Sequence, residues 1–223
     1  PWYDNIPFLS YLLLRGRCRF CAKVISPRYL IVELLTAIMF VALFRRYGLN
    51  YNFFFYLVFI CSLIIATFVD IKHRIIPDEV SLGGIALGFF FSIAKNIVEP
   101  RTFPFYDRRV NFFLNPPPAL DSLLGIILGG GIIYFTGKCF DWVYFKKLKR
   151  PPVDGESMSM GFGDVKLLAM IGAFLGWQKV MLTFFIAPVF GLFFGILNLL
   201  IKKEHLIPYG PFLSLAALLT IFW

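Results

Sequence analysis

Two carboxylates in strongly apolar surroundings are the residues of this chain best suited to chemistry. Asp164 ends the run Gly161-Phe162-Gly163-Asp164, where a polar loop leads into an apolar segment, and Asp70 closes another apolar segment. An ionisable side chain at the entrance of a membrane segment is costly to keep there, and so it indicates a functional site. Two carboxyls that share one proton can work together, because one takes a proton from water while the other polarises a carbonyl group. The pair therefore predicts the chemistry of an aspartic protease.

Composition places these carboxyls in a membrane protein. The chain has 223 residues, of which 59% are hydrophobic and 28 are Phe, whereas soluble domains are about 45 to 50% apolar. Apolar segments close to the ~20 residues that span hydrocarbon recur along it. They are residues 29–44, 53–69, 80–98, 119–136, 165–175, 180–201 and 206–223. The sequence predicts an all-α, polytopic membrane helical bundle with about seven transmembrane segments, or eight if a helix precedes them.

Loop charges predict which ends of these segments face the cytoplasm. If the segments alternate across the bilayer, 15 of the 22 Lys and Arg residues fall on one side, in loops 1–28, 70–79, 137–166 and 202–205. The positive-inside rule makes that side cytoplasmic. The net charge of +9 then reflects topology and attraction to anionic membrane lipid. No nucleic-acid partner is expected.

The chain is expected to divide into a cytoplasmic lobe, residues 1–28, and a transmembrane domain, residues 29–223. The lobe carries Cys18-Arg19-Phe20-Cys21. On the reducing side of a membrane, such a pair favours metal binding or redox chemistry over a structural disulfide. A closed zinc site takes four ligands, so Cys18 and Cys21 supply at most half of one. Because the chain opens at Pro1 without Met and inside a polar loop, we expect further residues upstream.

Helix geometry places both carboxyls toward the cytoplasmic side. From Phe53 to Asp70 is about 26 Å of helix, which puts Asp70 near the cytoplasmic edge of the hydrocarbon. From Asp164 to the turn at Gly176 is only about 18 Å, short of the ~30 Å core, so Asp164 is expected below the membrane surface. The loop Gly161-Phe162-Gly163 would then line a cavity. The helix macrodipole favours Asp164 as the ionised member of the pair.

Motifs along almost the whole chain carry a family resemblance. They are Glu156-x-x-x-Met160-Gly-Phe-Gly-Asp-Val-Lys-Leu, Asp70 followed by Ile76-Pro77-Asp78, and residues 2–7, 14–18, 25–29, 32–36 and 207–212. Together they resemble the type IV prepilin peptidases, which are aspartic proteases of the GxGD type. The resemblance implies that Asp70 and Asp164 are catalytic, with Gly161 and Gly163 in the active-site loop. Cys18 and Cys21 match the second of the family's two zinc-binding cysteine pairs.

The resemblance implies a bifunctional enzyme of the bacterial inner membrane. Such enzymes cleave the short basic leader of type IV prepilins or type II secretion pseudopilins on the cytoplasmic side. They then methylate the new N-terminal amine with S-adenosylmethionine. The peptidase step needs no cofactor. The first helix and first cysteine pair of the family have no counterpart in this sequence, so zinc binding would depend on an upstream pair.

Other interpretations remain open. Asp70 and Asp164 could be interfacial charges paired with Lys72 and Lys166. A transporter or channel also buries carboxylates, commonly near the bilayer midplane between inverted repeats, whereas these two lie toward one side and no repeat is evident. A catalytically inactive scaffold for pilus assembly is a third possibility. The remaining acids of the cytoplasmic loops are expected to be solvated and together able to attract a basic leader; they are Asp78, Glu79, Asp154 and Glu156.

Three pairs of glycines at four-residue spacing predict close contacts between helices. They are Gly84 with Gly88, Gly125 with Gly129, and Gly191 with Gly195. Small residues at this spacing let two helix backbones approach each other within a membrane. We expect packing, rather than chemistry, at these positions.

Overall fold

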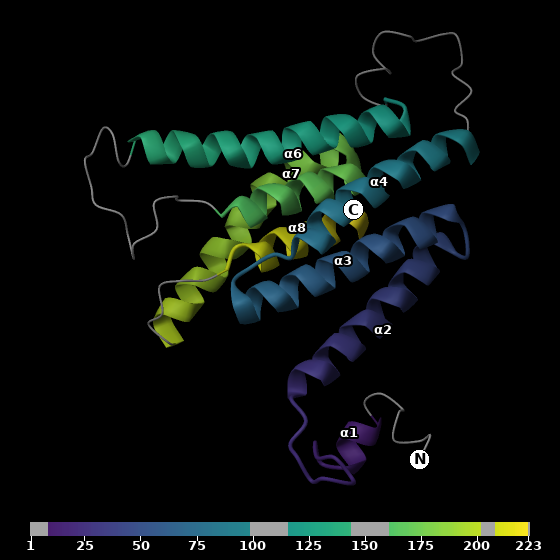
Figure 1. Cartoon of the computed structure of the whole chain (residues 1–223), viewed down its shortest axis with the longest axis vertical. Coiled ribbons are helices and arrows are strands. Elements are labelled where there is room, and N and C mark those ends of the chain that lie inside the picture. The colour runs from purple at the N-terminus through teal and green to yellow at the C-terminus, as the bar shows by residue number, and fades with distance from the viewer. Residues whose placement is uncertain (1–8, 99–115, 144–160, 202–207, 223) are drawn as a thin grey trace. The chain divides into compact units, whose positions relative to one another are not determined.

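The computed structural model describes residues 9–98, 116–143, 161–201 and 208–222 (Figure 1). Within these ranges the regular structure is helical, with one isolated antiparallel bridge between Arg17 and Val24. The helices are α1 (Leu9–Leu13), α2 (Pro27–Tyr47), α3 (Tyr51–His73), α4 (Asp78–Val98), α6 (Pro118–Asp141), α7 (Phe162–Ile201) and α8 (Gly210–Phe222). The prediction of an all-α chain is confirmed for the described residues.

Four of these helices are long and apolar enough to cross a membrane. They are α2, α3, α6 and the part of α7 that ends at Asn198, while α8 is apolar but shorter. This agrees with a multi-pass membrane protein. The number of seven spans and the side on which the first residues lie remain predictions.

The chain forms two compact units, Pro1–Ile64 and Ile65–Trp223. In the first unit, α2 begins with Pro27, whose fixed φ suits the first helical position. The Ser26 hydroxyl accepts the Arg28 backbone N–H at 3.4 Å and caps this end. Gly48, at φ 64°, ends the helix in a conformation that glycine adopts readily.

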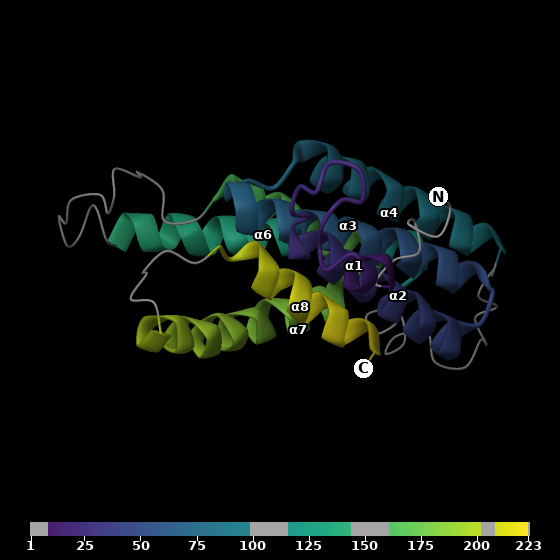
Figure 2. The same cartoon turned by 90° about the horizontal axis from the view of Figure 1, so that it is seen from below.

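In the second unit, α7 packs against α4, α6 and α8 (Figures 1 and 2). Its contact with α6 is a backbone contact, because a Cβ on Gly125 would collide with the carbonyl of Gly172, and a Cβ on Gly172 with that of Gly125. A Cβ on Gly129 would likewise meet the backbone of Leu168. The predicted close approach at the Gly125 pair is therefore confirmed.

The contact between α4 and α7 also depends on glycine. A Cβ on Gly84 would collide with Met170, and one on Gly88 would come within 2.9 Å of the Phe174 ring. The pair at 191–195 differs: Gly191 has only an ordinary contact, and Gly195 faces open space. Two of the three glycine pairs thus lie at tight helix contacts within the described residues.

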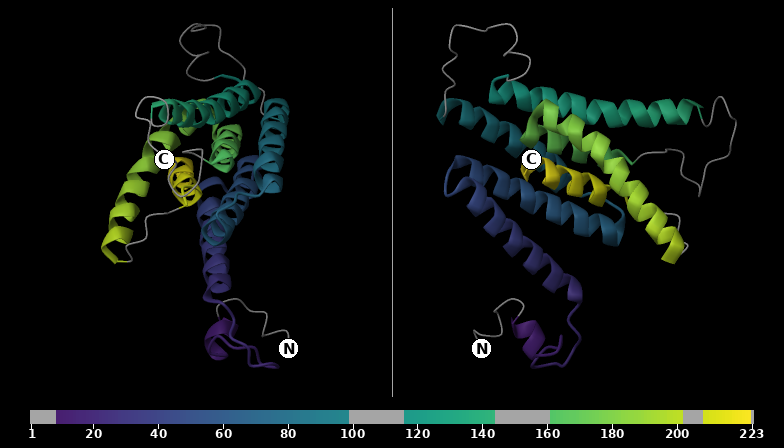
Figure 3. Two further views of the ribbon diagram at one scale, coloured as in Figure 1. Left: turned by 60° about the vertical axis from the view of Figure 1, so that its left-hand side comes forward. Right: turned by 180° about the vertical axis from the view of Figure 1, so that it is seen from behind.

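Helix α7 breaks at Gly176, where φ is 80° and ψ is 177°. The chain folds back at this point, so the two halves of α7 correspond to the separate apolar segments predicted at 165–175 and 180–201 (Figure 3). Asp121 of α6 holds the break, because its Oδ1 accepts the Trp177 backbone N–H at 3.0 Å. A Cβ on Gly176 would collide with this carboxylate, so the residue at the break must be glycine.

Candidate active site

Asp70 lies in the last turn of α3 and is only 6% exposed. Helix α3 ends just beyond it, at His73, because Arg74 adopts a left-handed φ of 55° and donates its N–H to the Asp70 carbonyl at 2.8 Å. The chain then passes through a short turn to Pro77 and begins α4 at Asp78. The turn between α3 and α4 therefore follows directly after Asp70 and forms one wall of the site.

Asp164 lies in the first turn of α7, where its backbone N–H donates to the Gly161 carbonyl at 3.1 Å. Gly163 faces the turn between α3 and α4, and a Cβ there would come within 3.3 Å of the Ile76 Cβ. Such a distance is tighter than most side-chain contacts, so glycine at this position lets the start of α7 lie directly against that turn.

A cavity of about 330 Å³ lies between these two segments. Asp70 and residues 74–76 and 78 line one side, and residues 161–164 and 166 line the other. The two carboxyls are near enough to interact electrostatically. The structure therefore brings together all four residues that the sequence assigned to peptidase chemistry, including the loop glycines Gly161 and Gly163.

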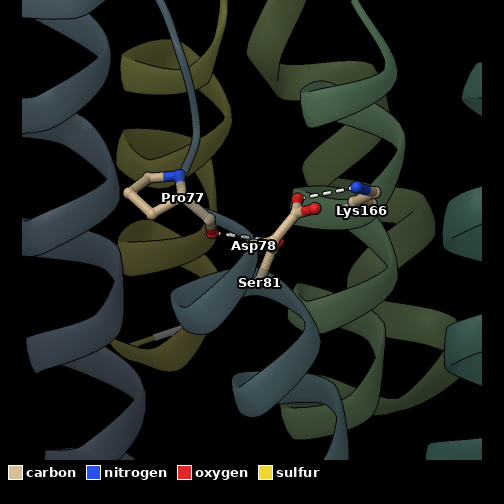
Figure 4. Close-up of polar contacts among 4 residues, drawn as sticks. All are labelled: Pro77, Asp78, Ser81 and Lys166. Atoms are coloured by element: carbon tan, nitrogen blue, oxygen red, sulfur yellow. Dashed lines mark hydrogen bonds and ion pairs between the residues drawn. The ribbon is translucent and has the colours of Figure 1, made fainter.

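At the same cavity, Lys166 and Asp78 form an ion pair with an Nζ to Oδ1 distance of 2.6 Å (Figure 4). Asp78 and Glu79 were expected to be solvated loop residues. Both are exposed, as expected, but they lie in the first turn of α4 rather than in a loop. Acidic residues are stabilised there by the helix macrodipole. Lys166 pairs with Asp78 rather than with Asp164, and its Nζ also lies 5.1 Å from the centroid of the Phe162 ring.

The other two acids that were expected to be solvated loop residues, Asp154 and Glu156, lie outside the described residues.

Ser81 supports the first turn of α4, because its hydroxyl donates to the Pro77 carbonyl at 3.1 Å (Figure 4). Lys166 pairs with Asp78, and among the described residues no ion pair joins Lys166 to Asp164. This weakens the interpretation of Asp164 as an interfacial charge neutralised by its neighbour two residues along.

Helix α8 contributes a third element, which sequence reasoning noted only as part of the family resemblance. The backbone N–H of Gly210 donates to Asp70 Oδ2 at 3.2 Å. The available signal was a glycine between two prolines at the start of an apolar helix, in Pro208-Tyr209-Gly210-Pro211.

Cys18 and Cys21 lie on one tight turn in the first unit. The Cys18 backbone N–H donates to the Lys23 carbonyl at 2.9 Å, and the Ala22 N–H donates to the Cys18 carbonyl at 2.9 Å. Neither Cys18 nor Cys21 is joined in a disulfide within the described residues. In the part of the chain that the structure describes, no three His, Cys, Asp or Glu side chains gather as metal ligands. The turn offers two thiols, so a tetrahedral zinc site would need two further ligands.

The sequence of this chain matches models of two known families. A sequence model of the type IV leader peptidase family matches residues 57–196, and a model of the bacterial peptidase A24 N-terminal domain matches residues 1–47. No solved structure matches this chain significantly.

Three similar proteins are each named prepilin leader peptidase/N-methyltransferase. The protein from Aeromonas hydrophila is 30% identical over 223 residues, which cover 99% of this chain and 67% of that protein. One from Xanthomonas campestris is 32% identical over 225 residues, covering 100% of this chain and 68% of its own length. One from Myxococcus xanthus is 32% identical over 199 residues, which cover 89% of this chain and 50% of that protein. Because the family model spans more than half of its length, this chain belongs to the type IV leader peptidase family.

Proposed function

We propose that this chain is an intramembrane aspartic endopeptidase that cleaves the basic leader of type IV prepilins or type II secretion pseudopilins. After cleavage it methylates the new N-terminal residue. The names of its relatives, prepilin leader peptidase/N-methyltransferase, support both activities. The main structural support for the peptidase activity is that Asp70 and Asp164 line one cavity, together with Gly161 and Gly163.

The proposed reaction is hydrolysis of one peptide bond by one water molecule. One carboxylate takes a proton from the water as its oxygen attacks the scissile carbonyl carbon, while the protonated partner donates to the carbonyl oxygen. The tetrahedral intermediate then collapses, the C–N bond breaks, and the leaving amine receives a proton. Two carboxyls that share a single proton supply every transfer in this sequence, so the peptidase step requires no metal and no cofactor.

The topology of the enzyme follows from the loop charges. We propose about seven transmembrane segments in this chain, with the ends that carry Asp70 and Asp164 on the cytoplasmic side of the bacterial inner membrane. Helices long enough to cross a membrane support the multi-pass arrangement. The excess of Lys and Arg in the loops on that side supports the orientation. The same charges would hold the loops against anionic lipid headgroups.

The methyltransferase half of the proposal concerns the first residues of the chain. We place it in the lobe of residues 1–28, ahead of the transmembrane domain of residues 29–223, because the N-terminal family model covers this lobe. S-adenosylmethionine is the expected methyl donor, and we assign it no residues. Cys18 and Cys21 would serve as two of four zinc ligands, which would fix the fold of the lobe, and the other two ligands would come from outside the described residues.

The peptidase proposal is tested by removing each acid without changing its shape. Asp70→Asn and Asp164→Asn should each abolish cleavage of a prepilin leader in membranes, measured as the shift in pilin mass. Glu33→Gln is the matched control, since Glu33 is an exposed carboxyl of α2 that does not line the cavity. Cleavage retained by either Asn variant, in protein that is inserted at the normal level, would refute the two-aspartate mechanism.

A further inference from the structure

We propose that Gly210 is a positioning residue of the peptidase, whose backbone N–H holds Asp70 as the carboxylate that takes the proton from water. Asp164 is then the partner that carries the proton and donates it to the scissile carbonyl. The inference rests on the proposed peptidase function and deepens it, because it gives each acid a separate role and adds a third chain segment to the site.

The hydrogen bond between Gly210 and Asp70 is the first step of the argument. Gly210 N lies 3.2 Å from Asp70 Oδ2, and both residues are buried. A backbone N–H can only donate, so this contact stabilises the charged form of the carboxylate that accepts it. Gly210 is also the first residue of the 13-residue helix α8, whose positive end favours a negative charge at that place.

The space around Gly210 is the second step. A Cβ at this position would lie 2.6 Å from Asp70 Oδ2 and 3.3 Å from Ile76 Cδ1. The first distance is shorter than real Cβ contacts allow, so any side chain at this position would push the carboxylate away from the donor. Glycine is therefore the residue that lets the start of α8 reach Asp70.

The contrast with Asp164 is the third step. Among the described residues, no N–H or O–H donates to the Asp164 carboxylate, although Asp164 also lies in the first turn of a helix. A direct hydrogen bond to a charge is stronger than the field of a helix end alone. The hydrogen bond from Gly210 therefore stabilises the charge of Asp70 more than the end of α7 stabilises the charge of Asp164. We infer that Asp70 is the ionised member of the pair, and not Asp164 as the sequence alone suggested.

These roles give a balanced reaction. Asp70 accepts a proton as the water oxygen bonds to the scissile carbon, and Asp164 gives its proton to the carbonyl oxygen. In the second half, Asp70 passes its proton to the amine nitrogen as the C–N bond breaks. The hydroxyl that received the Asp164 proton returns a proton to Asp164 as the new carboxyl forms. One water is consumed, and both acids end as they began.

The test uses the full chain in membranes or detergent with a prepilin leader peptide as substrate, and compares Gly210→Ala with Gly191→Ala. Gly191 is the matched control, because its Cβ would make only an ordinary contact, 3.7 Å from Phe212 of the same helix α8. We expect Gly210→Ala to lower kcat by about 100-fold while KM changes by less than about threefold. The acid limb of the kcat profile should also move to higher pH, since Asp70 loses the donor that stabilises its charge.

A double variant separates positioning from packing. Ile76→Val removes Cδ1, which would lie 3.3 Å from a Cβ on Gly210, and leaves the collision with Asp70 in place. Gly210→Ala/Ile76→Val should therefore stay as inactive as Gly210→Ala. Recovery of kcat in the double variant would mean that Gly210 only makes room for Ile76, and would overturn the proposal.

An ester in place of the Tyr209–Gly210 amide keeps the test decisive if Gly210→Ala fails to fold. Incorporating glycolic acid at position 210 deletes the N–H and adds no side chain. We expect kcat to fall by about 10- to 100-fold, with the same shift of the acid limb. An unchanged profile would overturn the role of Gly210 while the peptidase function stands. Absence of pilin cleavage by the unaltered chain would instead overturn the peptidase function itself.

Discussion

Lys166 of α7 and Asp78 of α4 form an ion pair, 2.6 Å from Nζ to Oδ1, that joins two chain segments 88 residues apart. Each partner lies close in sequence to one of the two acids proposed to be catalytic. Lys166 stands two residues after Asp164, and Asp78 follows Asp70 across the short turn between α3 and α4. The pair therefore connects the two walls of the cavity.

Breaking this pair should change catalysis more than stability. The side chains are 20% and 59% exposed for Lys166 and Asp78, and ion pairs this accessible contribute about 1 kcal/mol or less to folding. A small displacement of one catalytic acid relative to the other, however, can cost about 100-fold in rate. We expect Lys166→Met and Asp78→Asn each to lower kcat by about 10-fold or more, with little change in the midpoint of unfolding.

The reversed pair is the control for that prediction. Asp78→Lys/Lys166→Asp restores the attraction with its polarity exchanged, and should recover a substantial part of the lost kcat in the same leader-cleavage assay. If the double variant is no better than either single variant, the residues act on the substrate separately and the pair does not position the walls.

The break in α7 should depend on Gly176 and Asp121. Gly176→Ala would place a side chain at φ 80° and against the Asp121 carboxylate, and a strained backbone of this kind costs about 1 to 3 kcal/mol before the collision is counted. Asp121→Ala would remove the acceptor of the Trp177 N–H, at about 1 kcal/mol. Unfolding midpoints in detergent should fall for both, and further for Gly176→Ala.

Gly131→Ala is the comparison for these variants, because a Cβ on this α6 glycine would meet nothing within 4 Å. Alanine is also the better helix former, so its midpoint should stay the same or rise. Equal midpoints for Gly176→Ala and Gly131→Ala would show that the break in α7 is not held by these contacts.

The two proposed activities should separate by mutation. Cys18→Ser and Cys21→Ser should each lower methylation of a pre-cleaved pilin, measured by transfer of a labelled methyl group, while leader cleavage continues. Asp70→Asn should do the reverse. Cys139→Ser is the matched control, since this exposed thiol belongs to α6 and not to the turn that carries Cys18 and Cys21. Loss of both activities in Cys18→Ser, in protein that remains inserted, would argue against separate sites.

Part of the site could be predicted from residues that are neighbours in sequence. Asp164 behind Gly161 and Gly163, and Asp70 at the end of an apolar run, are local patterns whose cost inside a membrane is independent of the fold. The short distance from Asp164 to Gly176 predicted a turn there, and α7 does break at Gly176. Asp78 is exposed, as its charge suggested, but its place in the first turn of α4 and its pairing with Lys166 depend on the folded chain.

The sequence by itself determined that this chain is helical, suited to a membrane and equipped with two acids at segment ends, because hydropathy and helix length are properties of consecutive residues. Only the tertiary structure decided which groups surround those acids. Gly210 lies 140 residues from the carboxylate to which it donates, and no periodicity links residues so far apart. Their contact exists because the folded second unit brings the start of α8 to Asp70, while Asp164 has no such donor among the described residues.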